Sequence, residues 1–184
     1  MLIPIAPPAF DVTLDIVYAT AANLAGHPLY RRPAAFLHAD AAAALGRAAA
    51  LARAAGLGLR LYDAFRPVEA QWMLWQACPD PDYIADPRTG SNHSRGVAVD
   101  LTLDGPDGRP LDMGTGFDDM TAHSHHGRTD LAPAVVRNRA LLAGIMAASG
   151  FEPYAFEWWH YQLPGAGAYP LLTDRAAGTA LMGG

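Results

Sequence analysis

Four polar residues in two short segments have the types and spacing of a metal-dependent hydrolytic site. The segment SNHSRGVAVDLTL holds His93 and Asp100, and the segment EWWHY holds Glu157 and His160. Two neutral imidazoles and one carboxylate suit a zinc ion that keeps one coordination position open for water. Such an ion lowers the pKa of its water from ~15.7 to ~7. A carboxylate outside the ligand set, Glu157, could then take the proton.

These residues converge only if both segments turn. In a straight strand, His93 and Asp100 would face opposite ways, but Gly96 between them tolerates the backbone angles of a turn. Glu157 and His160 share one face if EWWH forms a helical turn. Spacing alone leaves plainer interpretations open: a hydrogen-bonded loop histidine, an aspartate that closes a hairpin and a glutamate that caps a turn.

Arg66 is predicted to lie where a strand gives way to a helix. The segment LGLRLYDAF alternates apolar and other residues with the period of a strand, and Pro67 suits the first turn of a helix. The residue before a proline is extended, so the side chain of Arg66 can project into a cleft. There its guanidinium could neutralise a developing oxyanion. Alternatively it anchors the helix start or pairs with Asp63 or Glu69.

Two further segments are predicted to be helices. The alanine-rich segment HADAAAALGRAAALARAAG is expected to form a helix that Asp40 caps and Gly56 ends. A second helix is predicted to begin at Pro133 and to stop at Gly150.

The remaining patterns indicate strands and loops. The segment VAVDLTL is predicted to be a strand with Asp100 on the face opposite the aliphatic residues, and residues 151–163 are predicted to form a strand pair or one strand with a bent end. Residues 78–90 are rich in Pro, Asp and Gly and are expected to form a loop. This mixed order of strands and helices predicts the α+β class. We expect one domain over residues 1–184, with looser order in residues 1–9 and 173–184.

Composition narrows the class of partner. The chain of 184 residues has 13 Lys and Arg against 18 Asp and Glu, a net charge of −5. Without a basic run, we expect neither a nucleic-acid nor a membrane partner. The single cysteine, Cys78, excludes an internal disulfide framework. The first residues lack the pattern of a secretory leader, so we expect a cytoplasmic location. The oligomeric state is not indicated.

The two segments of the first paragraph resemble the signature segments of D-alanyl-D-alanine dipeptidases. These are zinc enzymes of the peptidase family that also contains D,D-carboxypeptidases and relatives of the hedgehog N-terminal domain. The segments YDAFRP, LDMGTGFDDM and NRALLAGIMAASGF also resemble dipeptidase sequence, in the expected order. The similarity covers residues 10–172. It implies a small, mainly antiparallel central sheet flanked by helices.

The resemblance also implies a role for each matching position. The zinc ligands would be His93, Asp100 and His160, with one Zn²⁺ per chain. Glu157 would be the general base, and Arg66 would stabilise the oxyanion. Four residues would form the substrate site. Asp118 would bind the free ammonium of the substrate and Ser91 its carboxylate, and Tyr18 and Tyr30 would line the pocket.

The implied activity is hydrolysis of free D-alanyl-D-alanine to two molecules of D-alanine, in peptidoglycan metabolism. Two alternatives stay open: a D,D-carboxypeptidase that trims longer peptidoglycan peptides, and a catalytically inert zinc-containing binding module. Three histidines of AHSHHG, His123, His125 and His126, are expected to be loop residues or partners of site residues, with a separate metal site as the alternative.

Overall fold

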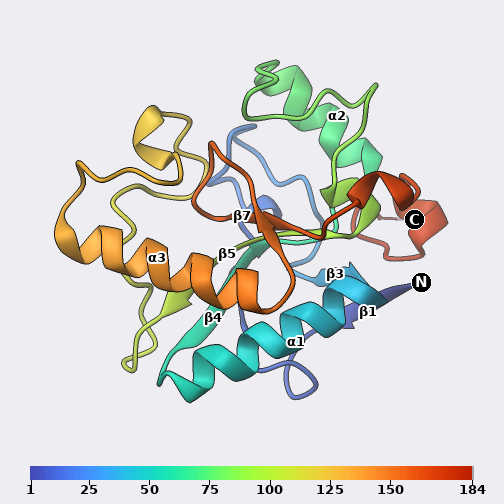
Figure 1. The fold of residues 1–184 in the computed structure, drawn as a ribbon. Helices are drawn as coiled ribbons and strands as arrows, with labels where there is room; N and C mark the ends of the chain where they lie inside the picture. Colours follow the sequence, from blue (N-terminus) through green and yellow to red (C-terminus); the bar gives the residue numbers. More distant parts are fainter. Residues whose placement is uncertain (184) are drawn as a thin grey trace.

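The protein has a central five-stranded sheet and a two-stranded sheet, in a computed structural model that describes residues 1–183 (Figure 1). The central strands lie in the order β2-β4-β5-β7-β6, with bounds Thr13–Leu14, Gly58–Asp63, Ala98–Asp104, His160–Gln162 and Glu152–Pro153. Within residues 1–183, β2 and β4 are the one parallel pair of this sheet, and the other pairs are antiparallel. The predicted α+β class with a mainly antiparallel sheet is therefore confirmed.

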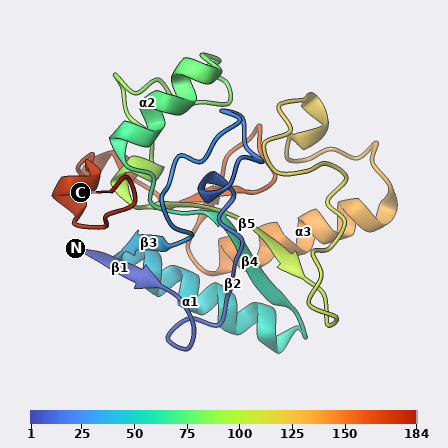
Figure 2. The same ribbon diagram turned by 180° about the vertical axis from the view of Figure 1, so that it is seen from behind.

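Helices cover one face of the central sheet. Figures 1 and 2 show α1 (Ala39–Ala54) and α3 (Pro133–Ala148) side by side on this face, while the chain from β2 to β3 and from β5 to α3 crosses the opposite face. The loop-covered face is where the candidate site lies. None of the helices in the described residues is long and apolar enough to cross a membrane.

The remaining elements are short. The helix α2 (Val68–Ala77) follows β4 after residues 64–67, and Pro67 occupies its N-cap, one position before the first turn in which we predicted it. The smaller sheet pairs β1 (Leu2–Ile5) with β3 (Ala35–His38), and α4 spans Asp174–Ala177. Four 3₁₀ turns, η1 to η4, span Val17–Ala19, His93–Arg95, Ala122–Ser124 and Ala166–Ala168. We expected looser order in residues 1–9 and 173–184, and these segments contain β1 and α4, respectively. Residue 184 lies outside the described residues.

The alanine-rich helix α1 forms as predicted, but its N-cap is a different residue. His38 occupies the cap, and its Nδ1 accepts a hydrogen bond from the backbone N–H of Asp40 at 3.3 Å. The prediction of Asp40 as the cap was wrong because the helix begins at Ala39, which puts Asp40 inside the first turn. Its charge is favourable there, beside the positive end of the helix dipole. Gly56 ends the helix with a φ of 74°, as expected.

Gly96 is the turn that allows His93 and Asp100 to converge. Its φ is 69°, and a Cβ there would lie 2.6 Å from Leu2 Cδ2 and 3.2 Å from the backbone nitrogen of His38. We therefore expect Gly96→Ala to destabilise the protein by about 2–4 kcal/mol, from the left-handed backbone and the overpacking together.

The measurement is urea unfolding of Gly96→Ala beside a matched control, Gly108→Ala. Gly108 has a φ of 73°, but within residues 1–183 nothing would lie within 4 Å of its Cβ. The control should lose only about 1–2 kcal/mol, the backbone share of the effect. An equal loss of unfolding free energy in Gly96→Ala and Gly108→Ala would show that the close packing of Gly96 against β1 and β3 does not contribute.

Candidate active site

One row across three neighbouring strands brings acidic and histidine side chains together. Asp63 of β4 pairs with Asp100 of β5, and Asp100 pairs with His160 of β7. The register shifts between Leu61 and Asp63, where two steps along β4 correspond to one step along β5. Bulges of this kind re-aim side chains beside active sites. The irregularity thus carries Asp63 into the row of Asp100.

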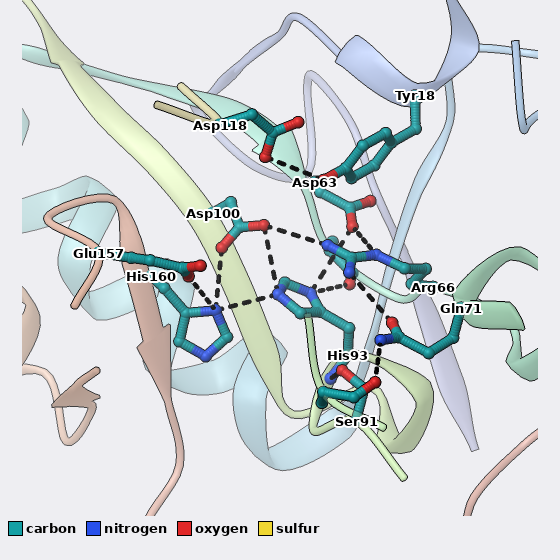
Figure 3. Close-up of polar contacts among 12 residues, drawn as sticks. Tyr18, Asp63, Arg66, Gln71, Ser91, His93, Asp100, Asp118, Glu157 and His160 are labelled. Atoms are coloured by element: carbon teal, nitrogen blue, oxygen red, sulfur yellow. Dashed lines mark hydrogen bonds and ion pairs between the residues drawn. The ribbon is translucent and has the colours of Figure 1, made fainter. Parts of the chain in front are cut away.

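The three predicted metal ligands meet at one point (Figure 3). His93 Nε2 lies 3.2 Å from Asp100 Oδ2 and 3.1 Å from His160 Nδ1, and His160 Nδ1 lies 3.1 Å from Asp100 Oδ1. Ligand atoms ~2.0–2.1 Å from a tetrahedral zinc ion would be ~3.3 Å apart. The donor set and its spacing therefore fit a small divalent cation.

Hydrogen bonds at the outer ring nitrogens support this fit. His93 Nδ1 lies 2.7 Å from the carbonyl oxygen of Ala64, and His160 Nε2 lies 3.2 Å from Gln162 Oε1. Each acceptor can take the proton of its ring at the outer nitrogen, which leaves the inner nitrogen able to present a lone pair to a cation. Metal-binding histidines in proteins are held in this way.

Glu157 stands beside this cluster because its segment turns. The backbone N–H of His160 donates to the carbonyl of Glu157 at 3.2 Å, and Glu157 Oε2 lies 3.7 Å from His160 Nδ1. The predicted turn of EWWH therefore forms. Burial raises the pKa of Glu157 to about 8, against the opposing charge of His160 and with help from Asp100 and Asp118. Such a carboxylate binds a proton near neutral pH, which suits an acid–base role.

Arg66 is buried beside the same cluster and held by several partners. Its Nε donates to Asp63 Oδ2 at 2.8 Å, and its Nη1 donates to Gln71 Oε1 at 3.1 Å. Its Nη2 lies 3.4 Å from Asp100 Oδ2, and its Cζ lies 4.7 Å from the ring centroid of Tyr18. The predicted ion pair of Arg66 with Asp63 therefore forms. The Arg66 side chain also lines the cavity, as its catalytic role would require.

Asp118 and Tyr18 form the opposite side of the site, on the loops that cover the sheet. Tyr18 Oη donates to Asp118 Oδ1 at 3.1 Å, whereas Asp118 Oδ2 is buried without a hydrogen-bond partner among the described residues. Burial raises the pKa of Asp118 to about 7, although Arg66 opposes the shift. Asp118 also has a φ of 60°, which few residues other than glycine adopt. A carboxylate oxygen held in this way would gain a partner from a cationic ligand.

A cavity of about 140 Å³ joins these groups. Its wall contains Tyr18, Arg66, His93, Asp100, Asp118, Glu157 and His160, together with Asn92, Tyr83, Tyr154 and Gln162. Two residues predicted to contact the substrate, Tyr30 and Ser91, lie outside this wall. The Tyr30 hydroxyl donates to Asp63 Oδ1 at 2.9 Å. The backbone N–H of His93 donates to Ser91 Oγ at 3.2 Å.

Four site residues were absent from the sequence predictions or had another role there. Asp63 and Gln71 hold Arg66, and Asn92 and Gln162 contact the cavity beside His160. One signal was readable for Gln162, because residues two apart on a strand share a face and Gln162 follows His160 by two. Asp63 was considered only as an ion-pair partner of Arg66, since the bulge that moves it carries no sequence signal.

The three histidines of AHSHHG differ in position. His123 is exposed, and His125 lies at the rim, where its Nε2 is 3.4 Å from Tyr83 Oη. The backbone N–H of His126 donates to the carbonyl oxygen of Ala155 at 2.9 Å, and burial, with the charge of Arg139, lowers the pKa of its side chain to about 4. His126 is therefore neutral at pH 7 and supports the loop that carries Glu157.

The site combines a histidine–aspartate donor cluster with a buried carboxylate and an arginine, on an α+β fold. This combination is that of a metallopeptidase. The chain belongs to the D-Ala-D-Ala dipeptidase family, since the sequence profile with that description matches residues 2–177. The resemblance seen in the sequence is thereby confirmed, and the protein is a peptidase.

Curated relatives agree with this family. The chain is 49% identical over 165 residues to the D-alanyl-D-alanine dipeptidase of Escherichia coli (strain K12), a match that covers 90% of this chain and 86% of the relative. It is 36% identical over 176 residues to the enzyme of that name from Enterococcus faecalis, covering 83% and 86%. The relative of the same name from Streptomyces coelicolor is 39% identical over 173 residues, covering 81% and 84%.

Proposed function

We propose that this protein is a zinc enzyme that hydrolyses free D-alanyl-D-alanine to two molecules of D-alanine. The observation that carries the proposal is that one cavity has a metal-type donor set on one wall and, on another, Asp118, whose Oδ2 has no hydrogen-bond partner within residues 1–183. The names of the relatives support the substrate. Because D-Ala-D-Ala is a building block of peptidoglycan, the proposal assigns the enzyme to cell-wall metabolism, with residues 1–184 as one domain.

His93 Nε2, Asp100 and His160 Nδ1 would hold one zinc ion per chain. When bound there, zinc would supply a Lewis acid that lowers the pKa of a coordinated water and polarises the peptide carbonyl. The supporting observation is the spacing of the three donor atoms, which lie within 4.8 Å of one another. One aspartate against a divalent ion leaves net positive charge at the site, as that chemistry requires.

Glu157 would move the proton. Its carboxylate would accept a proton from the attacking water and then donate it to the nitrogen of the leaving D-alanine as the C–N bond breaks. Glu157 is 8% exposed, so bulk water competes little for this proton. The turn that holds its carboxylate beside His160 supports this role.

Arg66 would stabilise the oxygen of the peptide carbonyl as negative charge develops on it. Its guanidinium is held by Asp63 and Gln71, so little reorganisation would be needed during the reaction. This side chain also lies against the ring of Tyr18, which lines the same cavity. Arg66 would therefore act as a catalytic residue.

Substrate length would be set at the two charged ends of the dipeptide. Asp118, hydrogen-bonded by Tyr18, would bind the free ammonium, and a longer chain or a blocked amine would leave this carboxylate buried without a cation. Ser91 does not itself line the cavity, but it lies between Gly90 and Asn92, which do, and its hydroxyl would turn to donate its proton to the substrate carboxylate. For Tyr30 we propose a supporting role behind Asp63 rather than contact with substrate.

Metal removal tests the proposal. A chelator such as dipicolinate should abolish the release of D-alanine from D-Ala-D-Ala, because the water then lacks its activating ion, and stoichiometric zinc should restore it. The measurement is D-alanine released per minute before treatment, after treatment and after zinc is added back. Full activity in the metal-free protein would contradict the zinc-dependent mechanism.

A further inference from the structure

Two amide side chains connect to the outer nitrogen of His160. Gln162 Oε1 lies 3.2 Å from His160 Nε2, and Asn92 Nδ2 donates to the same oxygen at 2.7 Å. Both amides line the cavity. We infer that Asn92 and Gln162 are positioning residues that fix the tautomer and ring orientation of His160 for metal binding. This inference rests on the metal site of the proposed function.

We call the two hydrogen bonds that Gln162 Oε1 makes, with Asn92 Nδ2 and with His160 Nε2, the relay. The direction of these hydrogen bonds follows from which groups can donate. Asn92 Nδ2 donates to Gln162 Oε1, so the carbonyl oxygen of Gln162, and not its NH₂ group, faces both Asn92 and His160. That oxygen can accept a second hydrogen bond, and His160 supplies it from Nε2–H. A cation bound between His160 Nδ1 and Asp100 Oδ1, which lie 3.1 Å apart, would then meet the lone pair of Nδ1, since the ring keeps its proton on Nε2.

The other tautomer of His160 would be opposed by the same relay. With its proton on Nδ1, the ring would place the Nε2 lone pair against the lone pairs of Gln162 Oε1 at 3.2 Å. It would also block the metal position with a hydrogen. The acceptor oxygen of Gln162 therefore selects the state of His160 that can bind a cation.

Strand geometry keeps the relay in place. His160 and Gln162 are two residues apart on β7 and share a face, and β7 is paired on both sides, with β5 and with β6. Asn92 directly precedes His93, so the relay also connects the segments that carry the two histidine ligands. The backbone carbonyl of Ala64 does for His93 what the amide of Gln162 does for His160.

The test is the zinc affinity of the metal-free protein, measured by competition with a chromophoric chelator. Gln162→Met keeps the length of the side chain but removes the acceptor, and it should weaken zinc binding by about 10–100-fold. Gln162→Glu retains an acceptor at the same place and should bind zinc at least as tightly as the wild type. Gln76→Met, the same replacement at an exposed position of α2, is the matched control and should not change the affinity.

Asn92→Asp separates the relay from a simple charge effect. An aspartate at this position would attract the NH₂ group of Gln162, turn the amide over and present a donor to His160 Nε2. The relay therefore predicts weaker zinc binding, again by about 10–100-fold. A purely electrostatic contribution predicts the opposite, because an added negative charge near the ion favours binding.

The outcomes separate the positioning role of Asn92 and Gln162 from the metal site itself. Equal zinc affinity in the wild type and Gln162→Met, or tighter binding in Asn92→Asp, would overturn the relay and leave the dipeptidase proposal intact. Absence of zinc binding by the wild-type protein would overturn the metal site itself. If Gln162→Met does not fold, as checked by circular dichroism, Asn92→Asp decides alone, because it alters no residue of the sheet.

Discussion

Glu157→Gln is expected to lower kcat for D-Ala-D-Ala by about 10²–10⁴-fold, because a glutamine cannot take the proton of the attacking water. KM and zinc content should stay near their wild-type values. Glutamine fills the same buried position without the cost of a charge, so folding should not suffer. Steady-state kinetics on zinc-loaded protein, with the zinc content measured by atomic absorption, test this directly.

The pH profile gives the same variant a second readout. Burial raises the pKa of Glu157 to about 8, and a cation held by His93, Asp100 and His160 would pull that pKa down, because it favours the carboxylate. In the zinc enzyme, kcat/KM should therefore rise with pH as this group loses its proton, on a limb below about pH 8. The limb assigned to Glu157 should be missing from the residual activity of Glu157→Gln.

An exposed glutamate serves as the control. Glu152→Gln makes the same chemical change on the exposed surface of β6 and should leave kcat within about twofold of the wild type, as surface substitutions usually do. Wild-type turnover in Glu157→Gln would remove this residue from the mechanism and return the search for a base to the rest of the cavity.

Asp118→Asn is expected to lower kcat/KM for the free dipeptide by about 10²–10³-fold. The reason is that the substrate ammonium would lose its charged partner in a buried site, where an unpaired charge is costly. The neutral amide still accepts the hydrogen bond of Tyr18, so the loop should keep its shape. The neighbouring substitution Asp119→Asn, which keeps an acceptor for the N–H of Thr121, is the control and should retain activity.

Stability separates this loss from unfolding. Burial raises the pKa of Asp118 to about 7, above the value of an aspartate in an unfolded chain. The unfolded state therefore releases its proton first, and the contribution of Asp118 to stability is lost as pH rises from about 4 to about 7. An asparagine has no such loss. At pH 8, metal-free Asp118→Asn should be at least as stable as the wild type, and lower stability there would contradict the assigned burial.

Much of the site could be predicted from local sequence. The turn at Gly96 and the turn of EWWH follow from glycine geometry and helical spacing, and together they bring the four residues of the first two segments into one site. The strand 58–63 and the helix after Pro67 likewise follow from short-range patterns. These features depend on neighbours within a few positions, which is what a sequence shows most directly.

The remaining features depend on contacts between distant segments. The register shift that places Asp63 opposite Asp100 arises from the pairing of β4 with β5, and no residue type announces it. Tyr30 was expected at the pocket wall, yet its hydroxyl is bound to Asp63, more than thirty positions away. Asn92 contacts Gln162 across seventy positions, so its part in the site becomes visible only once β5 and β7 are paired.

Dipeptidase activity is tested by comparing D-Ala-D-Ala with N-acetyl-D-Ala-D-Ala as substrates of the zinc-loaded protein, with L-Ala-L-Ala in parallel. The predicted result is release of D-alanine from the free D,D-dipeptide alone, because only this compound gives Asp118 a cation and has the right handedness. Comparable cleavage of the acetylated compound would contradict the account, remove Asp118 from its role and favour a D,D-carboxypeptidase. A zinc-loaded protein that cleaves none of the three would be the binding module instead.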